Sequence, residues 1–264
     1  MSDRNNEINN DTNNEVTKTY VEEVDSSASE QMAEPKLSAI AVIGAVIFSP
    51  TEAFKSLRQK PRVLLAIFLI PLLPVLYYLL CWDSYQFILI EQMQKSTQGT
   101  PIDPELMKTI LIGLRISTPI MTYVFYTPML LLPALIYFLI GKVTKAELTF
   151  KHAFSAILHA SVISSLVWVF HILMSQVFGQ SNVMASMSSL ASLLPADTVG
   201  SPLGTLAATI DIFSIWYLFV LYLALIYTCN YTKKVSAITV IGTYIVSTGF
   251  SVGAVVVATM MGGL

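Results

Sequence analysis

The residue with the clearest chemical potential is Asp211, an acid inside a long apolar stretch. An ionisable side chain within a membrane span costs about 2.5–3.5 kcal/mol on insertion scales, so it is usually paired or functional. His171 lies in the preceding apolar stretch at a similar predicted depth, which allows a hydrogen bond between the two side chains. Such a pair could relay a proton or an ion, or it could be a polar clasp between helices. We favour the clasp.

The remaining metal-binding residue types are few and scattered. His152 and His159 are seven residues apart, so they share one face of a helix. Two imidazoles alone do not make a stable metal site. Cys81 and Cys229 are predicted to lie near opposite membrane faces, so we expect no disulfide between them. We therefore predict no metal and no cofactor, and the chain carries no recognisable catalytic motif.

Residues 49–62, SPTEAFKSLRQKPR, predict a short amphipathic helix at the membrane surface. Ser49 and Glu52 have the spacing of a capping box, with a proline at the first helical position. Phe54 and Leu57 share the apolar face. The opposite face carries the basic residues Lys55, Arg58, Lys60 and Arg62. These bases either bind anionic lipid headgroups, at about 1 kcal/mol each, or only determine the topology.

The last apolar stretch contains a motif of small residues, Gly249-Phe-Ser-Val-Gly253. Glycines four residues apart allow two helix backbones to approach closely within a membrane. Gly249 and Gly253 are therefore candidates for helix packing. They serve either contacts within the chain or the formation of a homodimer.

The composition is unlike that of a soluble enzyme and is typical of a membrane protein. Of 264 residues, 54% are hydrophobic and 12% are charged, whereas soluble domains have about 25% charged residues. Residues 1–36 hold nine acids and three bases, and the rest of the chain holds eight acids and twelve bases. The acidic segment lacks the apolar surface that folding requires, which predicts a disordered tail. No basic cluster suggests a nucleic-acid partner.

Five apolar stretches are long enough to cross a bilayer, because a spanning helix needs about 20 residues. They are residues 63–82, 116–140, 153–178, 206–231 and 235–261. Prolines in the first two predict kinks. We therefore predict an all-α integral membrane protein, with a bundle of five transmembrane helices at 63–264. A short interfacial amphipathic segment at 37–62 precedes it.

The bases between these stretches predict the orientation. Nine lie on one side: Lys55, Arg58, Lys60, Arg62, Lys142, Lys145, Lys151, Lys233 and Lys234. The opposite side has Lys95, Lys108 and Arg115. Because basic loops stay cytoplasmic, we predict a cytoplasmic N-terminus and an external C-terminus.

Three segments together resemble the Yip-domain family of Rab-interacting membrane proteins and their prokaryotic relatives. They are SPTEAFKSLRQKPRVLL at 49–65, LTFKHAFSAILHAS at 148–161 and IDIFSIWYLFVLYLALIYTCNYTKKVS at 210–236. The resemblance implies a bundle of five transmembrane helices. Eukaryotic members are implicated in vesicle trafficking and bind prenylated GTPases. The chain is most similar to the prokaryotic branch, whose activity is undefined, so the resemblance does not imply the trafficking role.

Two functions fit these features. The first is a non-enzymatic scaffold or adaptor that contacts the lipid bilayer and membrane-protein partners or a second copy of the chain. It is expected in the cytoplasmic (inner) membrane of a prokaryote. The second is a transporter of small solutes or ions, which would use Asp211 with His159 and His171. Proline-broken spans can expose backbone groups that line a transport site.

Overall fold

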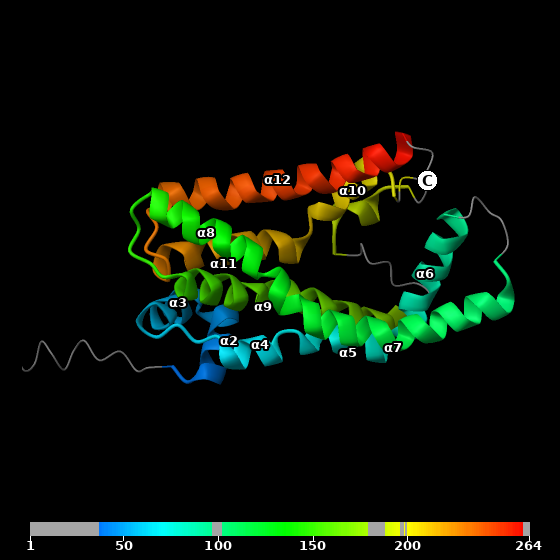
Figure 1. Cartoon of the computed structure of the whole chain (residues 1–264), viewed down its shortest axis with the longest axis horizontal. Coiled ribbons are helices and arrows are strands. Elements are labelled where there is room, and N and C mark those ends of the chain that lie inside the picture. The colour runs from blue at the N-terminus through cyan, green and yellow to red at the C-terminus, as the bar shows by residue number, and fades with distance from the viewer. Residues whose placement is uncertain (1–36, 97–101, 179–187, 196–197, 199, 261–264) are drawn as a thin grey trace, which may run out of the picture. The chain divides into compact units, whose positions relative to one another are not determined.

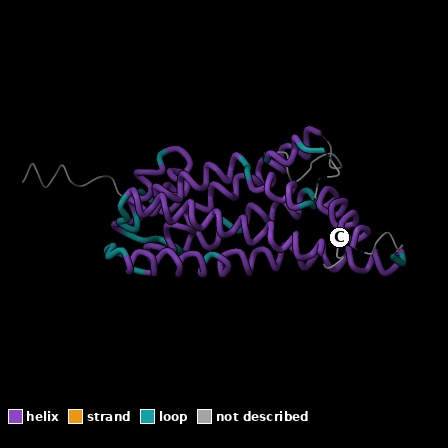
Figure 2. The backbone as a smooth tube through the Cα atoms, turned by 90° about the horizontal axis from the view of Figure 1, so that it is seen from above, coloured by secondary structure: helices purple, strands orange, loops and turns teal. Residues whose placement is uncertain are grey.

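The computed structural model describes residues 37–96, 102–178, 188–195, 198 and 200–260. The predicted acidic tail, 1–36, lies outside the described residues. Within them, every regular element is helical, apart from one isolated β-bridge (Figures 1 and 2). The helices from Ala39 onward belong to one unit.

The predicted surface segment forms two helices, α2 (Ala39–Phe48) and α3 (Pro50–Gln59). The apolar face of α3 is covered by protein, because Phe54 and Leu57 are fully buried and α3 packs on α2, α9 and α11. The predicted capping box is wrong. Ser49 makes no side-chain cap, and Glu52 pairs with Lys55 at 3.1 Å instead.

The first predicted span is broken. It consists of α4 (Leu64–Leu69) and α5 (Leu72–Leu80), and α6 (Trp82–Ser96) follows at an angle of 75°. The break between α4 and α5 falls at Pro71, which has no N–H to donate to the preceding turn. The predicted proline kink is confirmed here, and the chain turns again at Cys81.

The second predicted span is longer than expected. It forms α7 (Pro104–Met129) and α8 (Leu131–Val143), which together make one candidate span of 40 residues. The Oδ1 atom of Asp103 accepts the N–H of Glu105 at 2.9 Å and that of Leu106 at 3.1 Å. Asp103 therefore caps the start of α7.

The central element is α9 (Phe150–Phe178), the third predicted span. It packs on α2, α3, α5, α8 and α11. Alanines at 153, 156 and 160 are fully buried, which lets the neighbouring helices lie close.

The fourth predicted span is divided into α10 (Pro202–Thr209) and α11 (Ile212–Tyr227), and α12 (Lys233–Met260) forms the fifth. A helix of 16 residues, the length of α11, rises about 24 Å. This is shorter than the roughly 30 Å hydrocarbon core. α11 is short because the apolar stretch is interrupted at Asp211, which is the N-cap of α11.

Three helical segments are long and apolar enough to cross a membrane, and a fourth is if the bent pair of α4–α5 and α6 counts as one span. The all-helical membrane class is thus confirmed for the described residues. A count of five would require both that the bent pair is one span and that α10 and α11 act together as another.

Candidate functional site

The predicted pair of Asp211 and His171 lines a pocket of about 670 Å³. The pocket lies among α5, α6, α7, α9, α10, α11 and the segment at 188–189. Its described lining is Tyr77, Tyr78, Tyr85, Ile88, Tyr126, Ser164, Val167, Trp168, His171, Ser188, Ser189, Ala208, Asp211, Phe213 and Ser214. We call it the Asp211 pocket. Residues from separate predicted spans therefore line one pocket.

Asp211 acts first as a helix cap. Its Oδ1 atom accepts the backbone N–H of Phe213 at 2.8 Å and that of Ser214 at 3.0 Å. Its own backbone pairs with Ser189 in an isolated antiparallel bridge. The first N–H groups of α11 would otherwise lack acceptors in an apolar environment. Capping of α11 thus accounts in large part for the presence of an acid in this apolar stretch.

His171 is 5% exposed, and its Nε2 atom has no hydrogen-bond partner among the described residues. Its ring centre lies 5.9 Å from that of Tyr77 and 6.0 Å from that of Trp168. No hydrogen bond joins His171 to Asp211 in the described part of the chain, although both line one pocket. A buried unpaired nitrogen costs free energy unless water or a ligand satisfies it.

Sequence reasoning missed the aromatic wall of this pocket. The ring centres of Tyr77 and Trp168 are 5.1 Å apart, those of Tyr78 and Trp168 are 5.7 Å apart, and those of Tyr78 and Tyr85 are 4.8 Å apart. These separations are typical of favourable aromatic pairs. The adjacent tyrosines in the first predicted span were the available signal.

The four bases of the predicted lipid-contacting face have different environments, and at Arg62 the backbone carbonyl accepts the Ser155 hydroxyl at 3.1 Å. Arg58 donates from Nη1 to the backbone carbonyl of Glu147 and, at 3.3 Å, to that of Thr228. It therefore joins α3 to the turn before α9 and to the end of α11. Lys55 pairs with Glu52, and Lys60 is exposed.

His152 and His159 both make hydrogen bonds within the fold. The Nδ1 atom of His152 accepts the N–H of Thr149 at 3.1 Å, so its Nε2 atom donates to the Arg58 carbonyl at 3.2 Å. His159 is 1% exposed and donates from Nδ1 to the carbonyl of Ser155 at 2.9 Å. No group of three potential metal ligands occurs among the described residues.

Both cysteines are buried free thiols. The Sγ atom of Cys81 lies 3.0 Å from the Oγ atom of Ser175. Cys229 lies in the turn after α11 and is fully buried.

The glycines of α12 face open space. A Cβ atom built on Gly242, Gly249 or Gly253 would meet no atom within 4 Å. Spacings of seven and four residues place all three on one face of the helix. In the described structure, these glycines therefore serve no close packing within the chain, which corrects the internal-packing interpretation.

The comparisons with known proteins agree with the helical membrane architecture. The Yip1 domain matches residues 44–255. The "Membrane protein YknW" of Bacillus subtilis (strain 168) is 30% identical over 212 residues, which cover 78% of this chain and 87% of the relative. No solved structure matches. The match over most of its length shows that the chain is an integral membrane protein of the Yip1 domain family.

Proposed function

We propose that the protein is a non-enzymatic membrane scaffold or adaptor, acting through contacts with protein partners and lipid. The observation that carries this proposal is the open face of α12. Ile245, Val246 and Phe250 are 63%, 72% and 80% exposed, and a Cβ atom on the glycines beside them would meet no described atom within 4 Å. Lipid suffices to cover apolar side chains, but a row of glycines favours a second helix at close range.

The proposal places the basic residues of α3 at the cytoplasmic face, beside anionic lipid headgroups. Lys60 is the most available of them, because it is exposed and lies at the end of α3. The orientation rests on the distribution of bases along the sequence. It puts the N-terminus in the cytoplasm and the C-terminus outside, in a prokaryotic cytoplasmic membrane.

The test is photo-crosslinking in the native membrane from a probe at Phe250, followed by affinity purification. A scaffold gives discrete crosslinked protein products, either a dimer of the chain or a complex with another protein. The variant G249L/G253L should lose these products, because two leucines remove the close approach. A matched control is G44L/G113L, because these glycines also have open space around them. Products that survive in G249L/G253L would refute the role of this face.

A transporter is the second candidate, supported by the shared pocket of Asp211 and His171. It predicts solute or ion flux across proteoliposomes that falls in both D211N and H171A. Flux that neither substitution changes would remove this candidate, without affecting the crosslinking result.

A further inference from the structure

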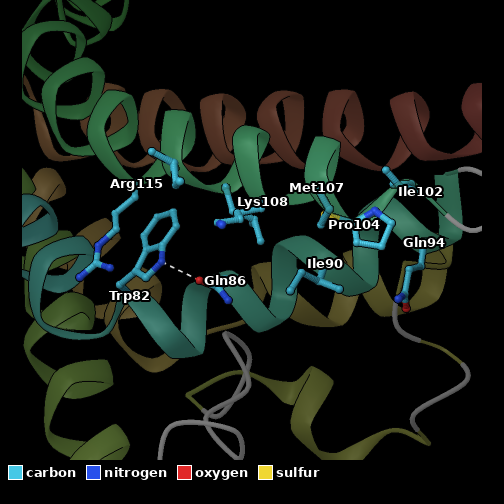
Figure 3. Close-up of a pocket in the computed structure, with 11 residues that line it drawn as sticks. Trp82, Gln86, Ile90, Gln94, Ile102, Pro104, Met107, Lys108 and Arg115 are labelled. Carbon is cyan, nitrogen blue, oxygen red and sulfur yellow. Dashed lines mark hydrogen bonds between the residues drawn. The ribbon is translucent and has the colours of Figure 1, made fainter.

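A second pocket, of about 750 Å³, lies between α6 and the first half of α7 (Figure 3). We call it the Arg115 pocket. It is distinct from the Asp211 pocket, although the two share an aromatic boundary. Trp82 lines the Arg115 pocket and Tyr85 lines the other, with ring centres 5.8 Å apart. Neither the adaptor proposal nor the transport candidate uses the Arg115 pocket.

Two basic side chains from α7 line this pocket. Lys108 and Arg115 are seven residues apart, so they share one face of the helix. The Cζ atom of Arg115 lies 6.0 Å from the ring centre of Trp82, at the limit for a cation–π contact. Figure 3 shows Arg115 beside Trp82 and Lys108 between the two helices. No acidic side chain is among the described residues that line the pocket.

These two charges also have no acidic partner elsewhere in the described chain. The ion pair found there joins Lys55 and Glu52. The site thus concentrates two positive charges without a counter-charge from the described residues. Within the described lining, an anionic group would find two cationic hydrogen-bond donors and no carboxylate.

The place of these bases in the sequence is unusual. The predicted external side carries only Lys95, Lys108 and Arg115, and two of these three line one pocket. Bases that serve only to set the topology belong on the cytoplasmic side. An anionic ligand would give Lys108 and Arg115 a role besides topology.

The rest of the lining is largely apolar. It includes Ile90, Met107, Leu111 and Ile112, and Ile112 is 54% exposed. Trp82 donates from its indole N–H to the Gln86 side chain at 2.7 Å, which fixes the indole at the inner end of α6 (Figure 3). Trp, Arg and Lys together are typical of the level of lipid headgroups.

We propose that the Arg115 pocket binds the phosphate group of an amphiphile whose headgroup has a net negative charge. The guanidinium of Arg115 provides paired N–H donors that match phosphate oxygens, and Lys108 adds a second charge. The apolar chain of the ligand lies along Leu111 and Ile112. This lipid-type site is separate from the basic face of α3, so either can fail alone.

The test uses the purified full-length chain in detergent, with phosphatidylglycerol and phosphatidylcholine offered in equal amounts. Native mass spectrometry measures which lipid stays bound. We expect retention of phosphatidylglycerol, reduced about fivefold for each base removed. The variants are K108Q, R115Q and K108Q/R115Q. The control K145Q/K234Q removes the same charge from exposed sites outside the pocket.

The outcomes separate the explanations. Equal loss in the control pair would mean general charge attraction and would overturn the proposal, as would unchanged retention in K108Q/R115Q. Displacement by an equimolar amount of inorganic phosphate would overturn the role of the apolar lining, since free phosphate would then be a sufficient ligand. If the double variant does not fold, K108Q alone decides, because Lys108 is exposed.

Discussion

The carboxylate of Asp211 lies in the same pocket as the imidazole of His171, yet its hydrogen bonds go to the first turn of α11. A capping carboxylate satisfies two backbone N–H groups and interacts favourably with the positive end of the helix dipole. This accounts for an acid within an apolar stretch without any transported ion. Among the described residues, the Nε2 atom of His171 is the member of the pair that has no hydrogen-bond partner.

The first prediction separates the capping role of Asp211 from a charge role. Replacing Asp211 by Ala should lower the free energy of unfolding by about 1 kcal/mol, within a range of 0.5–2. Replacing it by Asn should have little effect, because Asn also accepts hydrogen bonds at this position. Thermal unfolding of the purified protein in detergent, followed by circular dichroism, measures both changes.

H171A serves as the control, since it removes the imidazole and leaves the cap in place. If D211N were destabilised as much as D211A, the negative charge and not the cap would stabilise the fold. A charge effect that persists in the H171A background would come from the dipole of α11, and one that disappears there would favour a direct interaction of Asp211 with His171.

The sequence predicted the helical stretches well and their breaks unevenly. Pro71 signals a break through its missing N–H, and the structure has one there. Asp211 breaks a run that is apolar on both sides, and hydropathy does not register a cap. The break depends on the hydrogen bonds of one carboxylate. These hydrogen bonds depend on the local backbone geometry, which the spacing of apolar residues does not reveal.

The candidate sites, like the helices, could be predicted only in part. The similar predicted depth of Asp211 and His171 in their spans suggested that they lie near each other, and both line one pocket. The role of Arg58 could not be predicted, because its acceptors belong to Glu147 and Thr228, 89 and 170 residues away. A pattern of charges along one helix contains no information about such distant carbonyls.

The second prediction concerns that role of Arg58. R58A should destabilise the protein by about 1.5–3 kcal/mol, the usual range for hydrogen bonds that involve a charged group. K60A removes a neighbouring exposed base and should change stability by less than about 0.5 kcal/mol. Unfolding by SDS titration in mixed micelles compares the two variants. Equal, small effects would mean that Arg58 acts only as a surface charge.

The third prediction concerns topology. If α10 and α11 together form the fourth span, a reporter fused after Met260 should be external. A second reporter inserted at Lys145, in the turn between α8 and α9, should be cytoplasmic. An internal signal after Met260, with the Lys145 reporter still cytoplasmic, would mean that α10 and α11 do not cross the membrane.

The fourth prediction compares two glycines that have opposite surroundings. A Cβ atom at Gly141 would lie 2.5 Å from Leu148 Cδ2 and 3.0 Å from Tyr231 Cε1, whereas one at Gly113 meets nothing within 4 Å. Leu148 and Tyr231 are 5% and 4% exposed, and the Tyr231 hydroxyl donates to the Tyr137 carbonyl. Neither side chain can therefore move freely to make room for a methyl group.

We expect G141A to lower the free energy of unfolding by about 1–3 kcal/mol, the usual cost of overpacking. G113A should raise it by about 0.5–1 kcal/mol, because alanine loses less conformational entropy in a helix than glycine. SDS titration of both variants under the same conditions gives the comparison. If G141A were as stable as G113A, the segment that contains Leu148 would be able to shift away from α8 and make room for the methyl group. The close packing of Leu148 on Gly141 would then not be needed for stability.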